Sequence, residues 1–359
     1  CSGTTNDAVS IFIYDNTASA ADAGADQQLC TPTTTAQLSG NAPVGVAVGT
    51  WSVSQGTGVF ADVNDPNSSI SGLGVGETIL TWTIDNGPCG SSSDDVSILL
   101  FDAGNPDADA GPDQAVCTPV TFAILAGSSV TFPAQGTWSV VQGTGVFADA
   151  NDPGTTVTGA SIGENIYAWT VSNGPCANGL TSDAVSLFVY DGQNPDANAG
   201  VDQELCLPAT SATLTGSSVT FPAIGTWTLV SGTGAFTDVN DPSTGVTGLS
   251  VGQNVFAWTV DNGPCANGLT SDTVRIDLFD EGNAIADAGP DQELCTPNTT
   301  MIMAGSALTF PSVGTWSVVQ GTGVFANEND PNTSVSGLTV GENIFQWIVS
   351  NGPCTNALT

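Results

Sequence analysis

The stretch NVFAWTVDNGPC, residues 254–265, contains the pattern that decides the fold. Phe256, Trp258 and Val260 alternate with other residues, so the three side chains lie on one face of an extended strand. The residues DNGPC that follow are typical of a turn. A period of two that ends in a turn predicts a half-buried β-strand rather than a helix.

The same pattern returns along the chain. GTW begins at positions 49, 136, 225 and 314, so the interval between successive copies is nearly constant. NGPC also occurs four times, at 86–89, 173–176, 262–265 and 351–354. The repeat of 87 to 89 residues has the size of an immunoglobulin domain. About seven short alternating strands per repeat predict a two-layer sandwich.

The predicted fold class is therefore all-β, as a tandem array of immunoglobulin-like, antiparallel β-sandwich domains. No stretch has the 3.6-residue period of a helix. The predicted divisions are a last strand of a preceding repeat at 1–15, repeats at 19–102, 106–191 and 195–280, and a fourth repeat at 284–359 that lacks its last strand.

Each repeat contains two tryptophans, and the spacing between them is the same in all four repeats. Their alternation with polar residues predicts that both pack in the core between the two sheets. A sugar-binding aromatic platform is the alternative, and it requires exposed ring faces. The eight residues are Trp51, Trp82, Trp138, Trp169, Trp227, Trp258, Trp316 and Trp347.

A second apolar stripe recurs on the outward faces of the last two strands of each repeat. It is interpreted as a lateral or interdomain contact, or as packing against the repeat's own first strand or linker. Its members are Phe12, Tyr14, Ile79, Leu99, Phe101, Ile166, Phe188, Tyr190, Val255, Phe279 and Ile344.

Nine cysteines recur with the repeat, and the two cysteines of a repeat keep one constant spacing, as from Cys30 to Cys89. Without CxxC pairs or histidine, they predict disulfides in an oxidising, extracellular setting rather than a zinc site. Pairing within each repeat is favoured. Pairing between repeats, as from Cys117 to Cys265, is the alternative, because the two positions lie at opposite ends of a standard sandwich. The predicted disulfide cysteines are Cys30, Cys89, Cys117, Cys176, Cys206, Cys265, Cys295 and Cys354, while Cys1 is expected to pair with a cysteine that precedes residue 1.

The charge of the chain excludes several classes of function. There are 35 acidic residues and one basic residue, Arg275, with neither lysine nor histidine, for a net charge of −34. Binding to nucleic acid or to anionic lipid needs cations that are missing here. Catalytic triads lack their base, and no apolar run is long enough for membrane insertion. We expect no enzymatic activity and no cofactor.

Two acidic loops recur and raise the alternative of calcium. Asp and Asn oxygens at alternate positions suit Ca²⁺, although no loop matches an EF-hand and Asn-Asp-Pro is an ordinary turn sequence. Turns and solvating charge are the favoured interpretation. The candidate ligands are Asp62, Asn64, Asp65, Asp107, Asp109, Asp113, Asp149, Asn151, Asp152, Asp238, Asn240 and Asp241.

Four linked elements carry a family resemblance. AGPDQ (288–292), GTWSVVQGTGVFA (314–326), NDPNTSVSGLTVGENIFQWIVSNGPC (329–354) and SDAVS (182–186) closely resemble the PKD-like, immunoglobulin-like repeats of Bacteroidota surface proteins. Such repeats often belong to gliding-motility-associated adhesins that the type IX system secretes. The resemblance implies β-sandwiches, a cell-surface or extracellular location, and a structural or adhesive role.

The favoured function is a structural segment of an extracellular fibre, stalk or adhesin on a bacterial surface, acting as a disulfide-stabilised rod. Its expected partners are copies of itself or a longer chain of like repeats. The alternative is a binding module for glycan or another surface, with a calcium-dependent form of it included, but the loops are nearly identical from repeat to repeat. Residues 7–15 either complete the fourth repeat of another copy or belong to a longer continuous chain. Because Cys1 and Cys354 occupy the same repeat position, the longer chain is favoured.

Overall fold

The computed structural model describes residues 3–17, 20–280, 282 and 285–354. The chain divides into two compact units, one of residues 1–116 and 120–189, the other of residues 117–119 and 190–359. The first unit contains sandwiches 1 and 2, and the second contains sandwiches 3 and 4 with the end of sandwich 2. Among the described residues, no helix is both long and apolar enough to cross a lipid bilayer.

Sandwich 1 consists of a four-stranded sheet in the order β1-β7-β6-β3 and a three-stranded sheet in the order β2-β5-β4. Its opening strand β1 runs parallel to its closing strand β7, with Cys30 opposite Phe101, while the other pairs are antiparallel. The strands are β1 (Gln27–Cys30), β2 (Thr35–Gln37), β3 (Val48–Gln55), β4 (Val59–Phe60), β5 (Ser69–Ser71), β6 (Gly76–Asp85) and β7 (Ser91–Phe101), with a 3-10 turn η1 (Gly87–Cys89) before β7.

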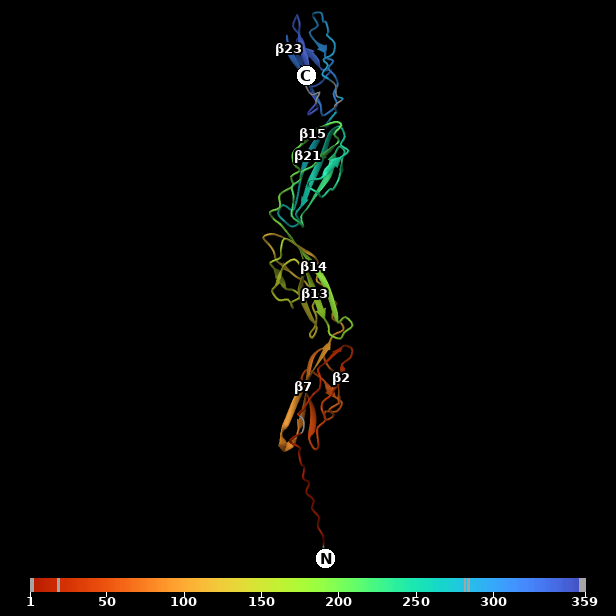
Figure 1. Ribbon diagram of the computed structural model, residues 1–359, viewed down its shortest axis with the longest axis vertical. Helices are drawn as coiled ribbons and strands as arrows, with labels where there is room; N and C mark the ends of the chain where they lie inside the picture. Colours follow the sequence, from red (N-terminus) through yellow and green to blue (C-terminus); the bar gives the residue numbers. More distant parts are fainter. Residues whose placement is uncertain (1–2, 18–19, 281, 283–284, 355–359) are drawn as a thin grey trace. The chain divides into compact units, whose positions relative to one another are not determined.

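Sandwiches 2 and 3 repeat this arrangement, with sheets β10-β13-β14-β8 and β15-β21-β20-β17 (Figure 1). The strands of sandwich 2 are β8 (Gln114–Cys117), β9 (Ala123–Ile124), β10 (Gln135–Gln142), β11 (Val146–Phe147), β12 (Thr156–Thr158), β13 (Gly163–Ser172) and β14 (Leu180–Tyr190). Those of sandwich 3 are β15 (Gln203–Cys206), β16 (Ser211–Thr213), β17 (Ile224–Ser231), β18 (Ala235–Phe236), β19 (Gly245–Thr247), β20 (Gly252–Asp261) and β21 (Leu269–Phe279). The all-β, tandem-sandwich prediction is confirmed.

The tryptophans form the centre of each core, as predicted. All eight are buried, and within each sandwich the two rings pack with centroids 4.8 to 5.0 Å apart. The glycine of GTW makes room for this pair, because a Cβ on Gly225 would lie 2.0 Å from the ring of Trp258. The ring faces are therefore enclosed between the sheets, and the sugar-platform alternative is wrong.

Sandwich 4 differs from the others in its edge strands. It contains β22 (Met301–Ile302), β23 (Val313–Gln320), β24 (Val324–Phe325), β25 (Ser334–Ser336) and β26 (Ile344–Ser350). Among the described residues, β26 pairs with β23 and with no closing strand, and no strand forms in 285–300. The indole nitrogens of Trp316 and Trp347 have no partner in this part of the chain, although their equivalents Trp227 and Trp258 donate to backbone carbonyls.

Some predicted features involve residues that the structure does not describe. Cys1, the predicted repeat starts at residues 19 and 284, and residues 355–359 lie outside the described residues. Within residues 3–17 no strand is assigned, so the predicted closing strand at 1–15 remains a prediction.

Candidate functional site at the junctions between sandwiches

Three disulfides form among the described residues, and the two cysteines of each bond belong to consecutive repeats and to the same compact unit. The first cysteine of one repeat bonds to the second cysteine of the next, with Cα atoms 5.1 to 5.4 Å apart. The bonds are Cys30–Cys176, Cys117–Cys265 and Cys206–Cys354.

The favoured pairing within each repeat is therefore wrong, and the interdomain alternative is confirmed. Cys30 ends β1 opposite Phe101, the last residue of β7, whereas Cys89 lies just before the first residue of β7. β7 has 11 residues, so its two ends are separated by roughly 33 Å. A disulfide needs Cα atoms within about 7 Å. The sandwich thus holds its own two cysteines apart, and Cys30 bonds instead to Cys176 of the next repeat.

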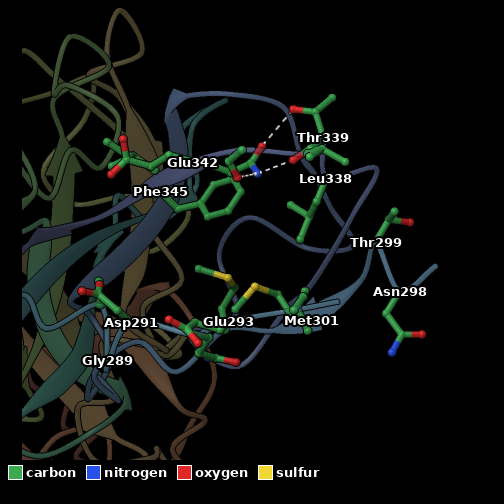
Figure 2. A pocket seen from close by; sticks show the side chains of 18 of the residues that line it. Gly289, Asp291, Glu293, Asn298, Thr299, Met301, Leu338, Thr339, Glu342 and Phe345 are labelled. Carbon is green, nitrogen blue, oxygen red and sulfur yellow. Dashed lines mark hydrogen bonds between the residues drawn. The ribbon is translucent and has the colours of Figure 1, made fainter. Parts of the chain in front are cut away.

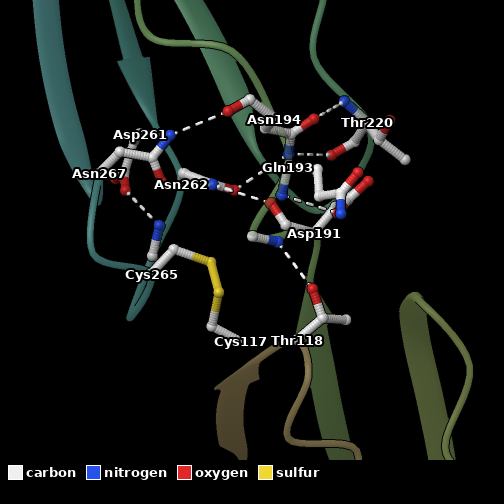
Figure 3. Close-up of a disulfide and its surroundings, with 12 residues drawn as sticks. Cys117, Thr118, Asp191, Gln193, Asn194, Thr220, Asp261, Asn262, Cys265 and Asn267 are labelled. Atoms are coloured by element: carbon white, nitrogen blue, oxygen red, sulfur yellow. Dashed lines mark hydrogen bonds between the residues drawn. A yellow bond between two sulfur atoms is a disulfide. The ribbon is translucent and has the colours of Figure 1, made fainter.

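A network of asparagines lies beside the Cys117–Cys265 bond. In Figure 3, Asn262 donates from Nδ2 to the carbonyl of Asp191 at 3.0 Å and accepts at Oδ1 from Asn194, also at 3.0 Å. Asn267 donates to the carbonyl of Asn194 at 2.9 Å. The amide of Asn262 is completely buried, and a neutral amide satisfies these groups without the cost of burying a charge.

The same network occurs in the first unit. Asn173 donates to the carbonyl of Asp102 at 2.9 Å and accepts from Asn105 at 3.0 Å. Asn178 donates to the carbonyl of Asn105 at 2.9 Å. The recurrence shows that the asparagine of NGPC is the residue that ties the end of one closing strand to the next sandwich.

The glycine of NGPC packs against an aromatic ring at the end of the preceding closing strand. A Cβ on Gly174 would lie 2.6 Å from the ring of Phe101, and Gly174 has a φ of 54°. Gly263 is placed in the same way against Tyr190, with a φ of 53°. The last aromatic residue of the predicted outward stripe therefore makes an interdomain contact within its unit, and glycine is required because no side chain fits beneath the ring.

Two further cysteines lie outside these bonds. Cys89 and Cys295 are exposed and unpaired in the described part of the chain. The Sγ atom of Cys89 lies 3.8 Å from the carbonyl of Tyr14, and Asn86 donates to the carbonyl of Asp15 at 2.7 Å.

The calcium candidates in the inner loops make hydrogen bonds that close turns and connect those turns to neighbouring strands. Asp238 accepts at Oδ1 from the amide of Asn240 at 2.9 Å, and Asn240 donates to the carbonyl of Gly225 at 2.8 Å. The equivalent residues of sandwiches 1 and 2 make the same bonds, and Asp65, Asp152 and Asp241 cap the turn that follows. No group of three or more acidic, cysteine or histidine side chains is gathered for a metal within the described residues. Calcium binding stays a prediction.

The calcium candidates in the segment before β8 also make hydrogen bonds within the fold. Asp109 accepts at Oδ1 from the amide of Gly111 at 2.9 Å, and Asp113 accepts from the amide of Ser186 on β14 at 2.8 Å. Asp107 accepts through its backbone carbonyl from the hydroxyl of Ser128 at 3.1 Å. Asp113 therefore pins the opening segment to the closing strand of the same sandwich, a role that the spacing of the acidic residues did not reveal.

An ion-pair cluster interrupts the apolar stripe on β21. Nε of Arg275 lies 3.1 Å from Asp277, and its guanidinium also approaches Asp202 at 3.6 Å. Asp277 is 7% exposed, and its Oδ1 has no hydrogen-bond partner in the described part of the chain. Burial raises the pKa of Asp277, and the Asp202 charge adds to this, while Arg275 acts in the opposite direction.

Comparison with known proteins finds similarity that is confined to part of longer proteins. No family model matches the chain. The mouse homologue of dyslexia-associated protein KIAA0319 is 27% identical over 258 residues, covering 68% of this chain and 24% of that protein. Human KIAA0319 is 25% identical over 264 residues, with 69% and 24% coverage. The chain thus spans about a quarter of the length of these curated relatives.

Several solved structures also resemble the chain. The PKD domain from KIAA 1837 protein is 31% identical with a TM-score of 0.21, covering 27% of this chain and 93% of that one. Sidekick-1 immunoglobulin domains 1–4 are 12% identical with a TM-score of 0.29, covering 94% and 96%. The titin I-band fragment I67–I69 is 14% identical with a TM-score of 0.31, covering 71% and 95%. The described residues form a tandem array of all-β sandwiches, and the three disulfides among them are typical of extracellular proteins.

Proposed function

We propose that the chain is a tension-bearing structural segment of an extracellular fibre, stalk or adhesin on a bacterial surface. One observation carries the proposal: every disulfide of the described residues joins a sandwich to the next one in the chain. The motif resemblance to repeats of Bacteroidota surface proteins supports the bacterial surface and secretion by the type IX route, whereas the curated relatives are mammalian.

The stagger of the bonds shortens the covalent line that carries a pulling force. A force that reaches Cys30 crosses to Cys176, follows the backbone only as far as Cys206, and crosses again to Cys354. Without these bonds the force would follow the whole backbone from Cys30 to Cys354. The segment between the two cysteines of each repeat, such as 118–175, lies outside this line and bears no tension.

The line is already extended in the folded protein. It runs through the closing strand β14 and the opening strand β15, both of which are β-strands. The backbone from Cys176 to Cys206 reaches at most about 100 Å, whereas the backbone from Cys30 to Cys354 reaches about 1,100 Å. Even if sandwiches 2 and 3 unfold, the array between these cysteines lengthens little, and a tether that keeps its length under load suits a stalk or fibre.

Single-molecule pulling tests this function directly. When the oxidised chain is held at its two ends, the line consists of the segment before Cys30, the backbone from Cys176 to Cys206, and the segment after Cys354. We expect a total contour length roughly one fifth of that of the C176S/C265S/C354S variant, in which the full backbone carries the force. Oxidised protein that lengthens as far as this variant would show that the bonds do not carry the load.

A further inference from the structure

A cavity of about 560 Å³ opens on the surface of sandwich 2 and lies entirely within the first unit. It is lined by residues from the loop between β9 and β10 and from the turn between β11 and β12, together with Trp169 of β13. Cavities that hold small-molecule ligands typically measure roughly 300–1,000 Å³. This cavity therefore has room for a ligand.

An exposed phenylalanine belongs to the lining of this cavity. Phe132 is 57% exposed, and the equivalent residues Phe221 and Phe310 of sandwiches 3 and 4 are 59% and 60% exposed. The corresponding loop of sandwich 1, residues 41–48, contains no phenylalanine. A single exposed apolar residue is common on protein surfaces. An exposed ring beside a cavity, in contrast, offers a flat apolar face to a ligand.

Hydrogen bonds fix the backbone on both sides of Phe132. The amide of Thr131 donates to Oδ1 of Asn105 at 2.8 Å, and Nδ2 of Asn105 donates to the carbonyl of Thr131 at 3.3 Å. The amide of Ala134 donates to the same carbonyl at 3.1 Å and closes a turn around Phe132. Asn105 is buried and also donates to Asn173 at 3.0 Å. The position of the ring is thus set before a ligand arrives, which lowers the entropic cost of binding.

Three polar side chains of the lining have free hydrogen-bonding groups. The hydroxyl of Ser129, the amide of Gln135 and Oδ1 of Asn151 make no hydrogen bond in the described part of the chain. Nδ2 of Asn151 donates to the carbonyl of Gly136 and to the hydroxyl of Thr137, both at 2.9 Å, which fixes the plane of its amide. Together the three side chains offer both donors and acceptors to a ligand.

The lining of this cavity is uncharged. None of the residues that line it is acidic or basic, although the chain has a net charge of −34. The cavity of sandwich 4 in Figure 2 differs, because Asp291, Glu293 and Glu342 line it. An anionic ligand would be repelled by the charge of the chain, and a cationic ligand would find no carboxylate in the cavity of sandwich 2. The lining therefore suits a neutral ligand.

We propose that the cavity of sandwich 2 binds a neutral saccharide. The C–H groups on one face of a pyranose ring pack against an aromatic ring, which Phe132 supplies. Each sugar hydroxyl both donates and accepts, so it matches the mixed set of Ser129, Gln135 and Asn151. The proposal adds a ligand to one repeat of the array and does not rest on the mechanical function.

The repeats differ in the residues of this cavity, and the differences identify sandwich 2. In sandwich 3 the serine is kept, but Ile224 replaces Gln135. In sandwich 4 the serine becomes Ala307 and the glutamine becomes Val313. The exposed phenylalanine and the full set of polar groups thus occur together only in sandwich 2 among these three repeats. The near identity of the other loops does not extend to this cavity.

A glycan array tests the proposal with the oxidised full chain. The array holds neutral oligosaccharides of glucose, mannose, galactose and N-acetylglucosamine, and acidic oligosaccharides of galacturonate. We expect retention on at least one neutral glycan, and F132A should weaken this binding at least about tenfold because the ring is removed. F221A is the matched control, because Phe221 is equally exposed but has Ile224 beside it. Binding by F221A should stay within about twofold of the parent.

A second variant tests the polar groups. S129A/Q135V gives sandwich 2 the two residues of sandwich 4 and should weaken binding about fivefold or more. All the substituted side chains are exposed, and thermal unfolding verifies that each variant folds as the parent does. Equal binding by F132A and F221A, or binding that S129A/Q135V leaves unchanged, would overturn the assignment to this cavity.

The choice of ligand class has its own test. Proline-rich peptides also bind to aromatic grooves, so decaproline is the peptide probe. Retention on no neutral glycan, retention on galacturonate alone, or binding of decaproline in place of a glycan would overturn the saccharide proposal. Because no load is applied, these results are independent of the contour length that tests the mechanical function.

Discussion

Cys117 and Cys265 belong to consecutive repeats, yet their Cα atoms lie 5.1 Å apart and their sulfurs are bonded. Cys117 ends the opening strand β8, and Cys265 follows the turn after β20. The bond therefore connects two sandwiches that each have a complete core, which distinguishes it from the disulfide that crosses the core of an antibody domain.

Loss of this bond should destabilise the second unit. A cross-link between two residues 148 positions apart reduces the conformational entropy of the unfolded chain. Native disulfides typically contribute about 2–5 kcal/mol to the free energy of unfolding. C265S, C117S and the double variant should each lower the free energy of unfolding by a similar amount, because the second substitution removes nothing further. Urea unfolding of the three proteins measures this. Losses that add in the double variant would show that the two cysteines stabilise the fold separately.

Substitution of the glycine beneath Tyr190 should disrupt the same junction. An alanine at Gly263 would bring Cβ within 2.6 Å of the ring in a backbone with a φ of 53°. We expect G263A to cost about 2–4 kcal/mol, from backbone strain and displacement of the ring. Gly248 is the control, since its φ is 75° but no atom lies within 4 Å of a Cβ there, so G248A should cost about 1 kcal/mol. Thermal unfolding of both variants compares the two effects, and equal losses would contradict a steric role for the ring.

The buried asparagine of the junction should not tolerate a charge. N262D removes the Nδ2 donor to the carbonyl of Asp191 and places a carboxylate at a fully buried position. The expected loss is about 3 kcal/mol or more at neutral pH, and it should shrink in acid as the carboxyl is protonated. N198D is the matched control, because the equivalent residue of sandwich 2 is Asp109 and makes the same turn bond. Similar losses for N262D and N198D across the pH range would show that burial at Asn262 is not the cause.

Replacement of Asp277 by an apolar residue should stabilise sandwich 3. The equivalent positions are Leu99 in sandwich 1 and Phe188 in sandwich 2, and D277L would remove a buried carboxylate with an unpaired oxygen. We expect a gain of about 1–2 kcal/mol at pH 7, measured by urea unfolding.

The same substitution should change the pH dependence of stability. Because the pKa of Asp277 is raised in the folded state, the folded chain holds the proton more tightly than the unfolded chain. Its contribution to stability is therefore greatest below about pH 4 and is lost as pH rises through the folded pKa. The gain from D277L should grow over that range. A gain that is the same at pH 3.5 and pH 7 would argue against burial of the charged form.

Much of the fold could be predicted from local pattern. The alternation of Phe256, Trp258 and Val260 indicates which face of β20 is buried, because side chains in a strand alternate between two faces. The recurrence of GTW and NGPC likewise indicates the number and length of the repeats. The asparagine network was not predicted, although the repeated Asn before Gly-Pro-Cys was a visible signal, because its partners lie 71 residues away along the chain.

The sequence by itself determined the all-β class, the repeat period, the buried tryptophans and the use of cysteine for disulfides, since each depends on spacing within a few residues, on the recurrence of short motifs or on a count. Which cysteines pair was decided only by the tertiary structure. The constant spacing of the two cysteines in a repeat fits a bond within a repeat or between repeats equally well. The parallel pairing of β1 with β7 places Cys30 at the far end of an 11-residue strand from Cys89, so these two cysteines cannot bond to each other, and Cys30 bonds to Cys176.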